Sequence, residues 1–229
     1  MALSGTEAVR AVMRRAQCLL LDFDGPVCDI FAGLPAPMVA ASLRATLEEA
    51  GATLPPEVRT TDDPLEVFRF SGALSNDLNR LALGTLAELE VKAVGTARPT
   101  PGAADLIELA RGRGMAVAIA SNNSVAAVTA FLDREELTAQ IDYISARTAK
   151  DPSLMKPNPH LLDQALTYLS ADPSSALLVG DSVTDVEASR LAGVVAVGYA
   201  NRPGKVERLS AVGADLIVTS MAELADALR

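Results

Sequence analysis

The 229-residue sequence predicts an α/β fold, a doubly wound and mostly parallel sheet that carries a helical insert. From residue 103 onward, short apolar runs alternate with helical patterns, which is typical of parallel βαβ units. The run at 18–21 is apolar without interruption, as in a strand covered on both faces. Residues 29–96 instead repeat Ala and Leu at helical spacing without a strand pattern, which predicts a 68-residue helical insert.

The composition narrows the classes of function. Apolar residues make up 49% of the chain, and the length suits one core with an insertion. Twenty basic against 29 acidic residues give a net charge of −9, which argues against sequence-independent binding to nucleic acid and against binding to an anionic membrane. No apolar run approaches the roughly 18 residues of a membrane span. Cys18 and Cys28, the two cysteines, are interpreted as reduced thiols, and we therefore expect a soluble, cytoplasmic protein.

The first hundred residues contain one predicted strand and four predicted helices. A helix over 6–16 precedes the strand at 18–21. The insert should begin a helix near Pro37 that Gly51 ends, and a second at Asp63, with Asp63 as the cap, Pro64 at the first helical position and Glu66 reaching back. Ser75 should begin the third helix of the insert. The segment 96–102 has the Pro and Gly content of a hinge back to the core.

The remainder alternates helix and strand. A helix that begins near residue 103 is ended by Gly112 and Gly114, and the last helix is opened by Ser220 with Glu223 in a capping box. The strands of this part are predicted at 115–120, 141–145, 176–180, 194–198 and 215–219.

Acidic side chains follow the first predicted strand. Asp22 and Asp24 stand where the run at 18–21 must end, and the chain can turn there so that both carboxylates converge. Close carboxylates repel each other unless a cation lies between them or they share a proton. In open α/β sheets, ligands bind at the carboxyl ends of the strands. The sequence therefore predicts a site at this edge of the sheet.

Polar and charged residues that could complete this site follow other predicted strands. Ser121 to Asn123 follow the second strand and offer a hydroxyl and backbone amides, which suit phosphate at a helix start. Asp181 and Asp185 follow the fourth strand, and carboxylates from separate strands form an oxygen cage that suits Mg²⁺. Lys156 supplies a positive charge. Each residue alone has an ordinary structural explanation, but their joint arrival at successive strand ends favours a phosphate site.

The segments LLLDFDGPV, ASNN, MKPNP and LLVGDSVTD, in that order, resemble the haloacid dehalogenase superfamily of phosphohydrolases, and the resemblance covers the whole chain. The insert resembles the helical cap of the phosphoglycolate phosphatase and β-phosphoglucomutase branch. The resemblance implies a core of residues 1–28 and 97–229, a Rossmann-like sheet, and a small α-helical cap domain at 29–96.

The resemblance also implies a role for each motif residue. Asp22 is expected to be the nucleophile, and Asp24 the general acid and base that also offers its main-chain carbonyl to the metal. Mg²⁺ is the expected cofactor, held by Asp22, Asp24 and Asp181, with Asp185 ordering the metal's waters or Lys156. The expected phosphate ligands are Ser121, Asn122 and Lys156, of which Lys156 also lies beside the nucleophile.

Several choices stay open at this point. Pro26 departs from the family's usual Thr or Val and puts the local turn in doubt. Lys150 lies in the same loop as Lys156. We choose Lys156 as the site lysine because Pro157 and Pro159 stiffen its backbone.

Three functions remain possible. A Mg²⁺-dependent phosphatase of a small phosphorylated metabolite is expected first, a phosphomutase second, and a catalytically silent binding or regulatory protein third. The sequence names neither substrate nor oligomeric state. One or two of the insert's basic residues Arg59, Arg69, Arg80 and Lys92 could meet a substrate's polar tail, but each taken singly is interpreted as part of a solvated helix face.

Overall fold

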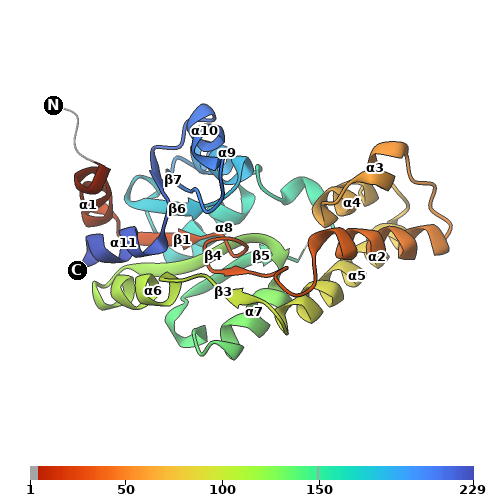
Figure 1. Cartoon of the computed structure of the whole chain (residues 1–229), viewed down its shortest axis with the longest axis horizontal. Helices are drawn as coiled ribbons and strands as arrows, with labels where there is room; N and C mark the ends of the chain where they lie inside the picture. The colour runs from red at the N-terminus through yellow and green to blue at the C-terminus, as the bar shows by residue number, and fades with distance from the viewer. Residues whose placement is uncertain (1–4, 149) are drawn as a thin grey trace.

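A computed structural model describes residues 5–148 and 150–229 of the chain (Figure 1). Its centre is a six-stranded sheet in the order β5-β4-β1-β6-β7-β8, and all neighbouring strands are parallel. The strands are β1 (Cys18–Leu21), β4 (Ala116–Ser124), β5 (Tyr143–Arg147), β6 (Ala176–Gly180), β7 (Val195–Tyr199) and β8 (Leu216–Val218). The chain builds outward from β1 in both directions, so the carboxyl end of β1 lies at the switch point where such sheets bind ligands. The predicted α/β class is confirmed.

Helices cover both faces of this sheet. One face packs against α1 (Gly5–Arg15), α6 (Ala103–Gly112), α7 (Val125–Arg134) and α11 (Met221–Leu228). The other packs against α8 (His160–Leu169) and α9 (Val183–Ala192), and α10 (Lys205–Ala211) lies against α9 and β7. Leu19 and Leu21 of β1 belong to the first apolar cluster, and Cys18 and Leu20 to the second. Successive strand residues face opposite ways, which explains why β1 had to be apolar throughout.

The insert forms four helices that lie together at one side of the sheet (Figure 1). They are α2 (Ala36–Glu49), α3 (Pro56–Thr60), α4 (Pro64–Ser71) and α5 (Asn76–Val94). Leu43, Leu47 and Phe68 are fully buried in a cluster that these helices share. The last turn of α5 instead packs into the sheet's own cluster through Ala93 and Val94. The division of the chain into a core and a cap domain at 29–96 stays a prediction.

Local side-chain chemistry starts the helices of the insert. The Asp63 carboxylate accepts a hydrogen bond from the N–H of Leu65 at 2.8 Å, and the Ser75 hydroxyl accepts one from Leu78 at 3.3 Å. Glu66 does not reach back to Asp63 as predicted. It pairs with Arg69 one turn later at 2.5 Å, because the opposite charge is the stronger partner. At the end of the chain, the predicted capping box of Ser220 and Glu223 is present.

The segment predicted as a hinge is tied to the first strand's loop. It contains β3 (Arg98–Pro99), which pairs antiparallel with β2 (Cys28–Asp29). The Thr100 hydroxyl donates to the main-chain oxygen of Gly25 at 2.6 Å. The chain therefore returns from the insert directly beside Asp24. Strand β4 also continues to Ser124, four residues beyond the predicted end.

Three short 3₁₀ helices complete the described chain, at Thr138–Gln140, Pro152–Leu154 and Pro173–Ser175. Within the described residues, no helix has both the length and the apolar character that a membrane crossing requires.

Candidate active site

The chain turns sharply after β1 and so brings Asp22 and Asp24 to the edge of the sheet. The N–H of Asp22 donates to Val179 of β6 at 2.9 Å, and its carboxylate accepts from the N–H of Phe23 at 2.7 Å. The Asp24 carboxylate accepts from the N–H of Ile30 at 3.2 Å. Both acidic side chains line one cleft, while Phe23 between them is fully buried in the core.

Lys156 lies at the centre of the predicted residues. It is 1% exposed, and its Nζ is 2.9 Å from Asp22 Oδ1 while also pairing with Asp185. The ammonium donates in addition to the main-chain oxygen of Ala120 at 2.8 Å. Burial alone lowers the pKa of Lys156, but Asp185 and Asp22 raise it above its ordinary value, so the charge is retained. The Nζ of Lys150 instead donates to Asn76 of the insert at 3.2 Å.

Asp181 and Asp185 follow β6 with different partners. Asp185 forms a capping box with Ser182 at the start of α9 and also binds Lys156, which was one of its two expected tasks. Asp181 pairs with Lys205 of α10 and accepts from the Asn201 amide at 3.3 Å. Burial raises the pKa of Asp181, although Lys205 beside it lowers it. Lys205 was missed by the sequence analysis.

Gly25 allows the loop after β1 to approach the loop after β6 closely. A Cβ at this position would lie 2.5 Å from Cγ of Asp181, and the residue has a φ of +105°. Glycine adopts this left-handed backbone without steric cost and leaves room for the carboxylate. The Asp-Gly step after the strand therefore places the loop of Asp22 and Asp24 against Asp181.

The carboxylates suit a hard divalent cation. Single oxygens of Asp22, Asp181 and Asp185 all lie within 4.8 Å of one another. Burial, reinforced by neighbouring carboxylates, raises the pKa of both Asp22 and Asp24 to about 7. A bound cation would offset this repulsion, and an all-oxygen donor set is the one that Mg²⁺ prefers. The residues therefore fit the predicted cofactor.

The expected phosphate ligands Ser121 and Asn122 lie at the end of β4, and both are buried. The Ser121 hydroxyl donates to the Asn123 side chain and accepts from its N–H, both at 3.2 Å. The Asn122 amide binds the main chain of Lys156, with the N–H donated to Oδ1 at 2.8 Å and the carbonyl accepting from Nδ2 at 3.2 Å. The Asn122 side chain thus holds the Lys156 backbone, and its expected contact with phosphate stays a prediction.

Basic residues that the sequence analysis did not place in the site also line the cleft. Arg69 of α4 donates to the main-chain oxygen of Lys156 at 2.9 Å, so it is not the solvated residue that was predicted. Arg202 and Arg208 lie on the opposite wall, near α10. Arg202, Lys205 and Arg208 form a basic cluster after the end of β7, and this cluster was a signal in the sequence. Nothing in the sequence indicated the contact of Arg69 with Lys156, because the two residues are 87 positions apart.

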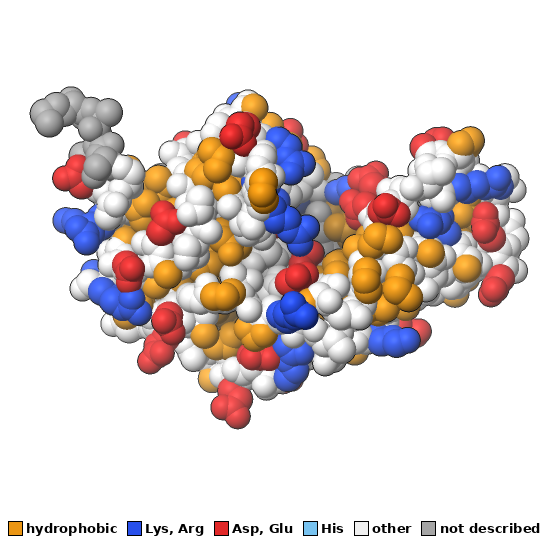
Figure 2. Space-filling model, viewed as in Figure 1, with side chains coloured by type: hydrophobic (Ala, Val, Ile, Leu, Met, Phe, Trp, Pro, Cys, Tyr) orange, Lys and Arg blue, Asp and Glu red, His pale blue; other side chains and the backbone are white. Residues whose placement is uncertain are grey.

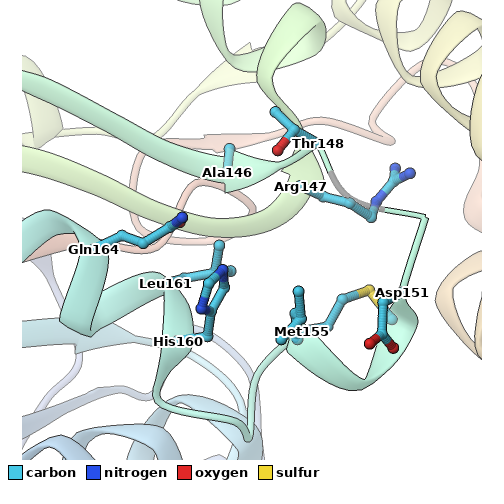
Figure 3. A pocket seen from close by; sticks show the side chains of 9 residues that line it. Ala146, Arg147, Thr148, Asp151, Met155, His160, Leu161 and Gln164 are labelled. Atoms are coloured by element: carbon cyan, nitrogen blue, oxygen red, sulfur yellow. The ribbon is translucent and has the colours of Figure 1, made fainter.

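The cleft has a volume of about 940 Å³ and separates the insert from the strand ends. Its insert wall carries Asp62, Asp63 and Glu66, and its core wall carries Arg202 and Arg208. Figure 2 shows acidic and basic side chains facing the hollow between the two parts of the molecule. His160, the only histidine of the sequence, lines a separate small pocket with Gln164 and Met155 (Figure 3). It therefore takes no part in the carboxylate site.

Comparison with known sequences points to one family. A family model described as "Haloacid dehalogenase-like hydrolase" matches residues 60–199. A phosphoglycolate phosphatase of Synechococcus elongatus is 36% identical over 97 residues, which cover 42% of this chain and 43% of that protein. The match thus spans less than half of that relative. A phosphoglycolate phosphatase of Neisseria meningitidis is 28% identical over 244 aligned positions, 96% of this chain and 97% of that one.

Solved structures share the fold. The crystal structure of a predicted phosphatase from Clostridium acetobutylicum aligns with a TM-score of 0.71 at 19% sequence identity, covering 92% of this chain and 97% of that one. At this identity the likeness establishes the architecture of sheet and helices alone.

Proposed function

Because the chain belongs to the haloacid dehalogenase-like hydrolase family, we propose that it is a Mg²⁺-dependent phosphatase acting on a small phosphomonoester metabolite through an aspartyl phosphate on Asp22. The observation that carries the proposal is the contact between Lys156 Nζ and Asp22 Oδ1 at 2.9 Å. A buried carboxylate that attacks phosphorus must approach an anion, and a fixed ammonium beside it lowers that barrier.

Asp22, the main-chain carbonyl of Asp24 and Asp181 are the proposed ligands of Mg²⁺. When bound, the ion supplies positive charge that offsets the charge of the phosphoryl group. Lys156 neutralises Asp22 and the incoming phosphate from the other side. Ser121 is the proposed side-chain donor to the phosphate oxygens, a role in which its hydroxyl hydrogen turns from Asn123 to the phosphate.

Asp24 carries the proton transfers in this proposal. In its acid form it donates a proton to the oxygen of the leaving alcohol as Asp22 Oδ forms its bond to phosphorus. The resulting Asp24 carboxylate then takes a proton from water, which attacks the aspartyl phosphate, releases phosphate and restores Asp22. Burial raises the pKa of Asp24 to about 7, so both protonation states are accessible near neutral pH.

Two further observations support the proposal. The curated relatives that match include phosphatases of phosphoglycolate, a small phosphorylated acid. Both cysteines are free and buried, which agrees with the reducing environment of a cytoplasmic enzyme.

Turnover of p-nitrophenyl phosphate by the purified protein tests the proposal. We expect activity that requires Mg²⁺, disappears with excess chelator, and falls by roughly 10³ or more in Asp22→Asn with the fold unchanged by circular dichroism. Asp105→Asn, in an exposed position of α6, is the control and should match the wild type. Near wild-type turnover by Asp22→Asn, or a rate unaffected by chelator, would rule the proposal out.

A further inference from the structure

A buried ion pair joins the insert to the carboxyl end of β4. Glu90 of α5 and Arg147 at the end of β5 are 2.7 Å apart, with side chains 1% and 2% exposed. Neither residue belongs to the motifs discussed above. Figure 3 shows the Arg147 side chain running from β5 away from His160 toward the helices of the insert. Its guanidinium lies 4.8 Å from the ring centroid of Phe68 in α4.

The same two side chains hold the last three residues of β4. Arg147 Nε donates to the main-chain oxygen of Asn122 at 2.9 Å. The Glu90 carboxylate accepts from the Ser124 N–H at 2.8 Å and from the Asn123 amide at 3.3 Å. Asn123 in turn contacts the Ser121 hydroxyl, and Asn122 holds the main chain of Lys156. A chain of direct contacts therefore runs from the ion pair to both predicted phosphate ligands and to the lysine.

Stability alone does not account for this pair. Removing two charges from water is expensive, and apolar side chains of similar size often replace a buried pair without loss of stability. Arg147 Nη1 is buried and has no hydrogen-bond partner among the described residues, which adds to the cost of the pair. Such a cost is expected where a side chain serves the geometry of a site.

We propose that Glu90 and Arg147 are positioning residues, which fix residues 121–124 at the end of β4 and, through Asn122, the backbone of Lys156 in the geometry that receives the phosphoryl group. The proposal rests on the proposed function for its catalytic consequence. Its structural content, that the pair orders this end of β4, stands independently of any activity. The pair also makes the insert part of the site, because Glu90 comes from α5.

A double variant separates positioning from stability. Glu90→Leu with Arg147→Met replaces the pair by apolar side chains and should keep Tm within about 5 °C of the wild type. Glu90→Leu alone leaves the Arg147 charge buried without a partner of opposite charge and should lower Tm by roughly 10 °C. In the folded double variant, we expect hydrogen exchange to quicken at the amides of Ser124 and Lys156 but not in β6. We also expect kcat/KM for p-nitrophenyl phosphate to fall about tenfold or more.

Two comparisons complete the test. Glu90→Asp with Arg147 intact keeps the negative charge and both acceptor oxygens, and should retain more of the exchange protection and activity than the double variant. Glu48→Ala with Arg59→Ala removes an exposed ion pair of the insert and should change neither. A double variant with wild-type exchange at both amides would overturn the proposal. A wild type without phosphatase activity would refute the proposed function instead, and the exchange data would still decide whether the pair orders the end of β4.

Discussion

The side-chain amide of Asn122 holds both main-chain polar groups of Lys156, through hydrogen bonds of 2.8 Å and 3.2 Å. Asn122 was predicted as a phosphate ligand, which stays a prediction, and in the structure its side chain orients the Lys156 backbone. Two hydrogen bonds across 34 residues of sequence fix the direction in which the Lys156 side chain leaves the chain. The ammonium is thereby aimed at Asp22.

Replacing Asn122 by Ala should therefore lower kcat by roughly tenfold to a hundredfold with a smaller change in KM, because a misplaced charged group loses most of its effect on the transition state. Steady-state kinetics with p-nitrophenyl phosphate measure both constants. Asn158→Ala is the matched control, since the Asn158 side chain lies in the same loop and accepts from the N–H of His160 at the start of α8. Equal losses in the two variants would mean that Asn122 has no special relation to Lys156.

Lys156 and Lys150 should respond very differently to substitution by Ala. Lys156 contacts Asp22 and Asp185, whereas Lys150 donates to Asn76 on the surface of the insert. Losing the fixed charge beside the reacting phosphoryl group should reduce kcat by roughly 10² or more, and the change at Lys150 should leave kcat within about twofold. Comparison of the two kcat values tests the choice between the lysines. A larger loss at Lys150 would refute it.

Gly25→Ala should disrupt the approach of the β1 loop to Asp181. A Cβ would lie 2.5 Å from Asp181 Cγ at a φ of +105°, so both strain and overlap oppose it. Gly51 is the matched control, since it has a φ of +91° with nothing within 4 Å of its Cβ. Gly51→Ala should cost about 1 kcal/mol in the free energy of unfolding. Gly25→Ala should cost more, and it should abolish the rise in Tm that we expect Mg²⁺ to give the wild type. Similar behaviour of the two variants would contradict the close approach.

Local chemistry explains how much of the fold the sequence could predict. The caps at Asp63 and Ser75 depend on hydrogen bonds within three residues, and β1 is apolar because both of its faces are covered. The pairing of β2 with β3 was missed, because each strand is two residues long and carries no periodic pattern. Their contact depends on where the insert returns to the core.

The site was predictable where its residues follow strand ends and hidden where its contacts cross the fold. Asp22 and Asp181 could be brought together because the ends of parallel strands share one edge. The pairing of Glu90 with Arg147 spans 57 residues and joins a helix of the insert to a strand, so no spacing in the sequence indicated it. The partner of Asp181, Lys205, likewise depends on how α10 packs.

Lys205 should weaken the binding of Mg²⁺ at Asp181, its proposed ligand. Its ammonium pairs with the Asp181 carboxylate and would repel a divalent cation held by the same group. Lys205→Met should therefore bind Mg²⁺ more tightly, by roughly threefold to tenfold. Calorimetric titration without substrate measures this, and Lys92→Met is a control with the same change of net charge on an exposed face of α5. Weaker binding in Lys205→Met would mean that the lysine orients Asp181 for the metal.

The cleft should favour small substrates, because the insert already reaches the loop of Lys156. Arg69 of α4 donates to the Lys156 carbonyl, and Asp63 and Glu66 line the same wall. Closure of such a wall over the site excludes water and leaves little room beyond a small phosphomonoester. We expect kcat/KM for phosphoglycolate or a small sugar phosphate to exceed that for a phosphopeptide by about tenfold or more, which is about 1.4 kcal/mol.

A panel of small sugar phosphates, phosphorylated acids, nucleotides and one phosphopeptide measures this preference, with phosphate release as the readout. A phosphopeptide preferred by roughly tenfold would contradict the closed cleft. Analysis of the products separates the remaining alternative, because a phosphomutase passes the phosphoryl group to a sugar hydroxyl where a phosphatase passes it to water. We expect water to be the acceptor, so that the amount of phosphate released matches the amount of substrate lost.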